Sequence, residues 1–200
     1  MYLQCTLVLL RFMKIFLTLF FLFFSSLVVA EDISDFQIEG ISIGDSALDY
    51  FSEEEIKNNL ENYYIDKTYL ITEIHSLPSF KVYEAIQIHF KSSDKNYIIE
   101  SVAGFLKYPN NIHECYDKKN QINDKISFLF QNMQNDKYDF QHNGDKSGKS
   151  IVSVTEFYNN DFSIRVSCTD WTEQMGYTDA LKVSITKNEF LYWIANSAYK

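Results

Sequence analysis

The sequence predicts an α+β domain: an antiparallel sheet of about six strands in two meanders, with a long helix and a C-terminal helix packed on one face. Two observations predict this class. Strand and helix patterns come in runs, whereas a doubly wound parallel sheet would alternate strand with helix. Successive strand patterns are also separated by short polar turns, which join antiparallel neighbours.

Residues 1–30 have the pattern of a secretory signal. Arg11 and Lys14 flank the start of the apolar run 15–24, and small residues precede Glu31. An apolar core of about ten residues is too short for a membrane helix. We therefore expect cleavage after residue 30, a single domain over residues 31–200, export to the periplasm, and no membrane association after signal cleavage.

Two alternatives concern this first segment. Residues 7–30 would form an uncleaved anchor if Arg11 and Lys14 did not interrupt the apolar run. Met13-Lys14 also puts the basic residue first, as signals usually do, so translation starts at either Met1 or Met13. A lipid anchor is not expected, since no cysteine stands at the cleavage point.

The predicted mature chain is acidic. Removing residues 1–30 takes two basic residues from the full-chain charge of −9 and leaves −11. Nucleic acid and anionic lipid headgroups should repel such a chain. The partner that we expect is an unknown protein or small molecule, with cationic ligands among the options. No pattern indicates a cofactor, and the four histidines lack metal-ligand spacing.

The first elements along the chain are an extended segment and two short helices. Phe36, Ile38, Ile41 and Ile43 lead into a turn at Gly44. Ser46 is placed to cap a short helical turn through Tyr50, and Ser52 with Glu55 forms a capping box for a helix from Glu53 to about Leu60.

Three strands follow, over Lys67–His75, Lys81–Lys91 and Tyr97–Leu106. The second alternates clearly, with apolar residues on one face and polar residues on the other. A long helix is predicted after Pro109, because apolar residues recur at helical spacing from Ile112 to Met133.

The remaining elements are a loop, three strands and a helix. Asn135–Lys149 is polar, contains Gly144 and Gly148, and is predicted as a mobile loop. Strands are expected over Ser150–Tyr158 and Phe162–Thr169, joined by a type I′ turn at Asn159-Asn160, and over Ala180–Thr186. Thr186 and Glu189 suggest a capping box for the final helix.

Cys115 and Cys168 are predicted to form a disulfide. Cys115 shares the helix stripe of Ile122 and Ile126, and Cys168 shares the inward face of its strand, so both thiols should meet between helix and sheet. An exported protein with two cysteines favours this pairing over two reduced thiols.

Two glutamates form a possible pocket. Alternation in the second strand puts Glu84 among inward residues, and Glu100 interrupts an apolar run in the third. Together they would bind a cation. If the third strand is shifted by one residue, Glu100 instead faces His89 across the hairpin and is solvated.

The segment Ile43-Gly44-Asp45-Ser46 resembles the opening block of the GDSL (SGNH) hydrolases, in which the serine is the nucleophile, and Asp139-x-x-His142 resembles that family's second element. The resemblance implies Ser46, Asp139 and His142 as a catalytic triad. The residues themselves favour Gly44 as a turn and Ser46 as a helix cap.

The opening segment, residues 33–52, is similar to a group of uncharacterised exported proteins from AT-rich marine alphaproteobacteria. This resemblance implies a periplasmic location and no activity. A looser likeness is to BamE-like (SmpA/OmlA) domains, in which a short helix pair precedes a three-stranded meander; those domains are lipoproteins.

Two functions are expected from these patterns. The first is a periplasmic, non-catalytic binding or interaction module, because no motif beyond the resemblance above carries chemistry. The alternative is a GDSL-like serine hydrolase that uses Ser46.

Overall fold

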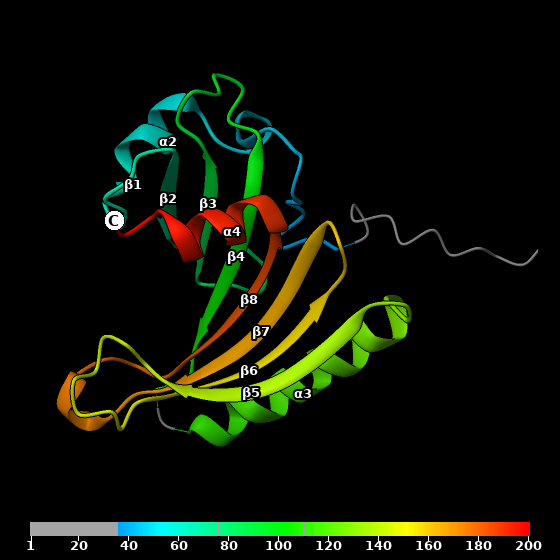
Figure 1. Ribbon diagram of the computed structural model, residues 1–200, viewed down its shortest axis with the longest axis vertical. Helices are drawn as coiled ribbons and strands as arrows, with labels where there is room; N and C mark the ends of the chain where they lie inside the picture. The colour runs from blue at the N-terminus through cyan, green and yellow to red at the C-terminus, as the bar shows by residue number, and fades with distance from the viewer. Residues whose placement is uncertain (1–35, 76, 110) are drawn as a thin grey trace, which may run out of the picture. The chain divides into compact units, whose positions relative to one another are not determined.

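The computed structural model describes residues 36–75, 77–109 and 111–200 (Figure 1). The predicted signal, with Met1, Met13 and the alternative anchor, lies outside these residues. The described chain is α+β, with one open antiparallel sheet of eight strands, so the predicted class is confirmed. In this part of the chain, no helix is long and apolar enough to cross a membrane.

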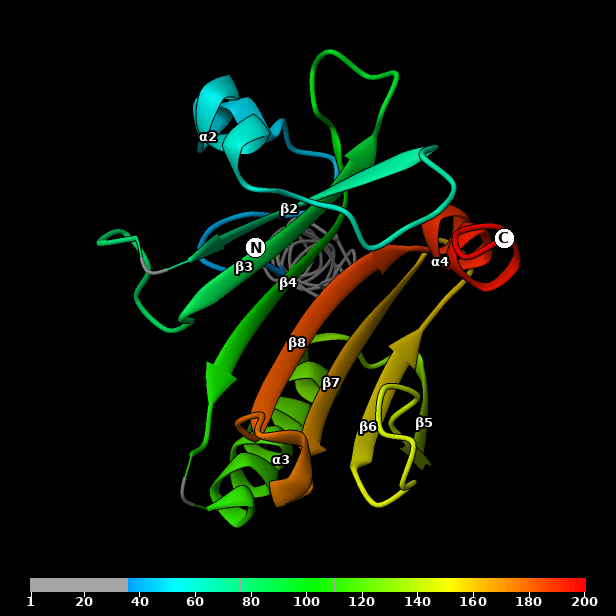
Figure 2. The same ribbon diagram turned by 90° about the vertical axis from the view of Figure 1, so that its left-hand side faces the viewer.

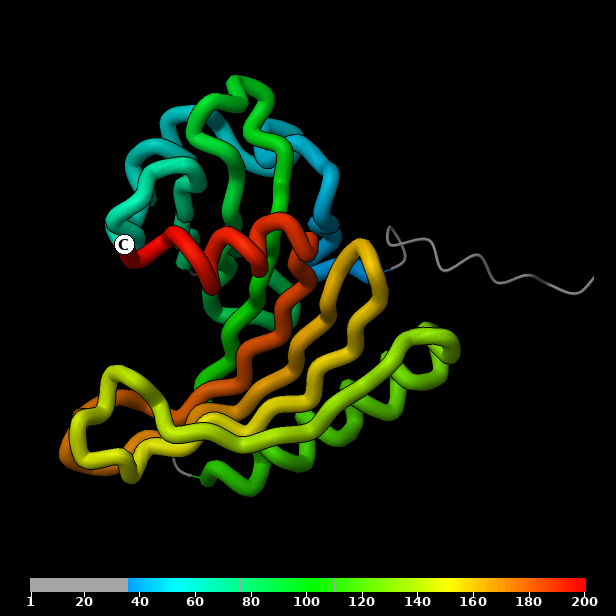
Figure 3. The backbone as a smooth tube through the Cα atoms, viewed as in Figure 1, coloured from blue at the N-terminus to red at the C-terminus, as the bar shows by residue number. Residues whose placement is uncertain are grey.

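The sheet is built from two meanders of four strands each. The spatial order is β1-β2-β3-β4-β8-β7-β6-β5, so β4 and β8 pair where the meanders join (Figure 3). The first meander contains β1 (Leu60–Glu61), β2 (Tyr69–His75), β3 (Ala85–Lys91) and β4 (Ile99–Lys107). The second contains β5 (Gln134–Gln141), β6 (Ile151–Tyr158), β7 (Phe162–Asp170) and β8 (Ala180–Lys187).

Among the residues that the structure describes, one helix is long and the others are short. They are η2 (Ala47–Asp49), α2 (Glu53–Asn58), α3 (Ile112–Leu129), η3 (Glu173–Met175) and α4 (Asn188–Asn196). Ser46 caps η2, and the Ser52–Glu55 capping box of α2 is present, as predicted. The N-terminal segment and α3 cover one face of the sheet, where their buried residues join a single apolar core with β3, β7 and β8.

The strand count exceeds the prediction by two. β1 (Leu60–Glu61) lies where the sequence predicts the end of a helix, and β5 (Gln134–Gln141) lies where it predicts a loop. All eight residues of β5 are exposed, so no apolar alternation marks it. β5 is held in an extended conformation by pairing with β6 along its whole length, from Gln134 opposite Tyr158 to Gln141 opposite Ile151. An edge strand of this kind is defined by backbone hydrogen bonds, which a pattern of side chains does not reveal.

The prediction that both helices lie on one face is wrong. α3 packs on the face of β7 that carries Cys168, whereas Phe190 of α4 packs against Tyr69 and His89, which point to the other face. Figures 1 and 2 show α4 and α3 on opposite sides of the sheet. The apolar residues of α4 pack on this face because Tyr69 forms a small apolar cluster there with Phe190 and Trp193. This cluster is separate from the main core.

Two local predictions are also wrong. Asn159 and Asn160 do not adopt the positive φ of a type I′ turn; instead the Asn159 side chain accepts hydrogen bonds from the N–H groups of Asp161 and Phe162. Thr186 does not cap α4, because β8 continues to Lys187 and the Thr186 hydroxyl hydrogen-bonds Ser101 at 2.8 Å.

Candidate binding site

The face of the sheet opposite α3, here called the open face, is unusually polar at its centre. Side chains alternate along a strand, so the residues of β7 divide between the two faces. The residues of β7 on the α3 side are Phe162, Ile164, Val166 and Cys168, and all are buried. Those on the open face are Ser163, Arg165, Ser167 and Thr169.

The neighbouring strands continue this pattern with small side chains. β8 presents Ala180, Lys182, Ser184 and Thr186, and Ser101 of β4 lies in the same row as Thr186. Because serine and alanine leave space above the sheet, a cavity of about 600 Å³ opens here. Phe190 and Tyr64 line one end. Trp171, His142 and Phe140 line the other end. Its size lies within the range of small-molecule sites, about 300–1,000 Å³.

Lys182 lines this cavity and has no carboxylate in contact among the described residues. Its Nζ donates to Gln87 Oε1 at 3.3 Å and stands 5.0 Å from the centre of the Phe105 ring. Within the described residues, no Asp or Glu oxygen lies within ion-pair distance of it. Burial, with repulsion from Arg165 added, lowers the pKa of Lys182 to about 8.

Arg165 is the second cation of the open face. It lies opposite Ser184 and Lys182 lies opposite Ser167, so the two cations are diagonal neighbours on adjacent strands. Such neighbours have Cα atoms roughly 7–8 Å apart. The guanidinium donates to Glu156 Oε1 at 3.0 Å.

Glu156 is held in place by further donors. Tyr138 Oη and Ser163 Oγ donate to it at 2.7 and 2.8 Å. Burial by itself raises the pKa of the Glu156 carboxyl, but the Tyr138 hydroxyl and the Arg165 charge outweigh burial, and the net pKa is lowered. The carboxylate is therefore ionised and compensates Arg165 at the edge of the site.

His89 is a buried neutral histidine on β3. Its Nε2 is 3.0 Å from the Tyr64 hydroxyl, and its ring packs 4.6 Å from that of Phe190. Burial, followed by the nearby Lys182 charge, lowers the pKa of His89 to about 3. It therefore adds a polar surface to the cavity and no charge at neutral pH.

The charge of the cavity is opposite to that of the chain. The full chain carries 27 acidic and 18 basic residues, yet the described residues that line the cavity include Lys182 and Arg165 and no Asp or Glu. What the arrangement can do chemically is bind an anion in a partly desolvated space, with hydroxyl donors beside the two cations.

The structure gives Ser46 the role of a helix cap. Its Oγ accepts from Leu48 N at 3.2 Å and donates to the Asn96 carbonyl at 2.7 Å. Gly44 has a φ of 92°, which suits a turn. None of the contacts of Ser46 within the described chain joins it to Asp139 or His142.

Asp139 and His142 lie on different sides of the sheet. Asp139 is an exposed residue of β5 opposite Ser153, whose hydroxyl is bound by Lys119 of α3. His142 lines the open-face cavity, 4.2 Å from the Trp171 ring, and burial lowers its pKa. The three residues of the hydrolase resemblance are thus not brought together.

Glu84 and Glu100 are also apart. The Glu84 backbone pairs with Phe105, five residues along β4 from Glu100, which corresponds to roughly 17 Å of strand. Each has its own lysine: Lys107 lies 3.9 Å from Glu84, and Lys187 lies 3.3 Å from Glu100. Glu100 is the extra residue of a bulge, with Ser101 rather than Glu100 opposite His89.

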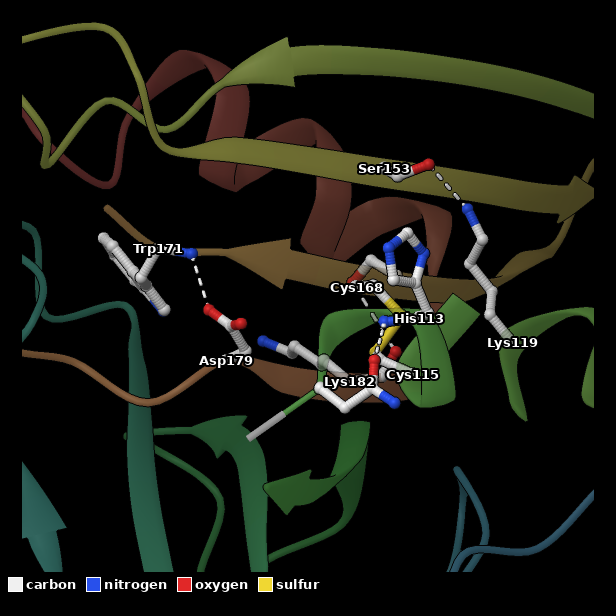
Figure 4. The surroundings of a disulfide bond; sticks show 10 residues. His113, Cys115, Lys119, Ser153, Cys168, Trp171, Asp179 and Lys182 are labelled. Atoms are coloured by element: carbon white, nitrogen blue, oxygen red, sulfur yellow. Dashed lines mark hydrogen bonds between the residues drawn. A yellow bond between two sulfur atoms is a disulfide. The ribbon is translucent and has the colours of Figure 1, made fainter. Parts of the chain in front are cut away.

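The predicted disulfide is present. Cys115 and Cys168 are bonded, with Cα atoms 6.1 Å apart, and the bond fixes α3 to β7 (Figure 4). Lys119, one turn further along α3, donates to Ser153 of β6 at 2.7 Å. Together these contacts support the α3 side of the strands that carry the cavity.

Within the described residues, no group of three or more His, Cys, Asp or Glu side chains is placed to bind a metal. Comparisons of the chain with protein-family models, curated proteins and solved structures found no match. The resemblances noted from the sequence therefore stay predictions.

Proposed function

We propose that the protein is an exported, non-catalytic binding module that works in the periplasm and holds a small molecule in the open-face cavity. The observation that carries this proposal is the cavity itself: about 600 Å³ above a regular sheet, formed by small hydroxyl and alanine side chains around two cations. Sites built on strands are positioned more precisely than sites on loops.

The disulfide supports the proposed location. Disulfides persist in oxidising compartments and are rare in the cytosol. The Cys115–Cys168 bond and the signal pattern of residues 1–30 both favour export. Finding the protein in the cytosolic fraction after gentle release of the periplasm would contradict this part of the proposal.

Binding is tested by two-dimensional amide NMR of the purified protein with a library of small acidic, basic and neutral compounds. We expect some of them to shift the Trp171 indole and the amides near Ser184. Ser184→Trp fills the cavity and should abolish these shifts. Ser127→Trp, at an exposed position of α3, is the matched control and should leave them unchanged.

The proposal fails if no compound of any charge perturbs residues of the open face. It also fails if Ser184→Trp, in a protein that keeps its native spectrum elsewhere, leaves binding intact.

A further inference from the structure

We propose that the ligand of the open-face cavity is a small organic anion, a carboxylate or phosphate ester with a flat apolar body. Its anionic group is bound between Lys182 and Arg165. This inference rests on the proposed function and names the class of ligand that the site takes.

The first argument is the position of the two cations. Lys182 of β8 and Arg165 of β7 are diagonal neighbours on the open face, and both line the cavity. Two oxygens of one carboxylate or phosphate can therefore reach both side chains. Arg165 keeps donors for this purpose, because a guanidinium has five N–H groups and the structure records one hydrogen bond, from Nη2 to Glu156.

The second argument is the missing counter-charge. Burying a cation is costly unless an opposite charge or several hydrogen bonds compensate it. Elsewhere on the sheet, Lys91 and Lys187 have glutamate oxygens at 2.9 and 3.3 Å. Lys182 contacts an amide oxygen and an aromatic ring. Glu73 attracts it from behind Gln87, whose Nε2 donates to the Glu73 carboxylate, but this attraction is smaller than the cost of burial. A bound anion would compensate the buried charge of Lys182.

The third argument is the positive charge of the residues that line the cavity. A cavity meant for a cation in this acidic protein would be expected to contain carboxylates, and the described lining contains none. The anion class also explains the row of small hydroxyl residues. Ser167 and Ser184 alternate with the two cations across β7 and β8. The Ser184 hydroxyl is placed to donate a further hydrogen bond, whereas that of Ser167 donates to the Lys182 carbonyl at 3.5 Å.

The aromatic residues that line the cavity indicate the apolar part of the ligand. Phe105 lies beside Lys182, and Trp171 and Phe140 form the end of the cavity near Val152. Flat aromatic walls at this end and polar groups at the centre fit a ligand that has an anionic head and an aromatic or planar body.

The test uses four compounds that share a naphthalene body: 1-naphthoate, 1-naphthyl phosphate, 1-naphthalenemethanol and 1-naphthylmethylammonium. Their affinities for the purified protein are measured by calorimetry, and their site is assigned by NMR. We expect at least one anion to bind at the open face about tenfold or more tightly than the alcohol and the ammonium compound. Comparing the affinities of 1-naphthoate and 1-naphthyl phosphate decides whether the site prefers a carboxylate or a phosphate ester.

Lys182→Met removes the charge and keeps the length of the side chain. This substitution should lower the affinity for the anion about tenfold or more and leave the affinity for the alcohol unchanged. Lys125→Met, on the exposed side of α3, is the matched control and should change neither. If Lys182→Met does not fold, the charge series on the unaltered protein decides the question alone.

Equal binding of anion, alcohol and ammonium compound at the open face would overturn this inference and leave the proposed function standing. So would unchanged anion affinity in folded Lys182→Met. Absence of any binding at the open face would overturn both.

Discussion

At the scale of single residues, the site depends on which side chains stand next to the two cations. Ser184 and Ser167 are the direct neighbours of Arg165 and Lys182 across the β7–β8 pair. Larger residues at these two positions would fill the space above the sheet. The chemistry of the cavity therefore depends as much on small neighbours as on charge.

The pH dependence of anion binding follows from the pKa of Lys182, which burial and Arg165 lower to about 8. Only the protonated amine attracts an anion, so 1-naphthoate affinity should be constant from pH 6 to about 7.5 and fall as the pH rises above about 8. The charged groups that act on Lys182 are Arg165 and Glu73. The lowered pKa of Glu156 keeps that carboxyl ionised over this range, and burial lowers the pKa of His142, which lines the same cavity. His89, with a pKa of about 3, stays neutral.

Calorimetric titrations at several pH values measure this dependence. In Lys182→Met the affinity should be low and independent of pH. A flat profile for the unaltered protein up to about pH 10 would mean that Lys182 does not bind the anion.

Ser46 gives a second prediction at this scale. Its hydroxyl hydrogen-bonds Leu48 N and the Asn96 carbonyl, and no histidine of the described chain hydrogen-bonds it, so a fluorophosphonate probe should not label it. Ser46→Ala should instead cost about 1 kcal/mol of stability through loss of the cap. Mass spectrometry of the probe-treated protein and urea unfolding check the two statements; labelling at Ser46 would revive the hydrolase alternative.

At the scale of elements, the sequence predicted the strands and helices in which apolar residues recur at regular spacing on one face. β2, β4, β6, β7, β8 and α3 were found near their expected bounds because each has apolar residues that recur on a buried face. β5 was missed because it buries no side chain, and β1 because it has two residues. The face on which α4 packs could not be predicted, since an apolar stripe shows that a helix packs and does not show where.

Gly104 tests how β4 packs. A Cβ added there would lie 2.5 Å from the Tyr83 ring. Gly104→Ala should therefore destabilise the protein by about 1–3 kcal/mol through overpacking. In a double-mutant cycle with Tyr83→Ala, the cost of Gly104→Ala should largely disappear in urea unfolding measurements. An equal cost with and without the Tyr83 ring would show that this contact is not the cause.

At the scale of the whole molecule, the disulfide connects α3 to the second meander, over a sequence separation of 53. Closing a loop of this length stabilises a chain by about 4 kcal/mol in the entropic account. Reduction should lower the unfolding midpoint by roughly 2–4 °C for each kcal/mol and leave a cooperatively folded protein, because the core face of the sheet remains buried. Calorimetric melting with and without reductant measures this; two free thiols in protein purified without reductant would contradict the bond.

The candidate site was only partly open to prediction. Its signal is present in the sequence as small residues, all hydroxyl-bearing except Ala180, at every second position of Phe162–Asp170 and Ala180–Lys187, interrupted by Arg165 and Lys182. The pairing of β4 with β8 could not be predicted, because it joins distant segments whose alternation fits several neighbours. Without that pairing, Gln87, Phe105 and Lys182 have no reason to be placed together.

A crystal structure of the protein with the tightest-binding naphthalene anion tests the central claim most directly. We predict the naphthalene body against the Trp171 end of the open-face cavity, with one anionic oxygen about 3 Å from Lys182 Nζ and another near the Arg165 guanidinium. A ligand bound elsewhere on the protein, or bound in the cavity with its anionic group turned away from both cations, would contradict the account.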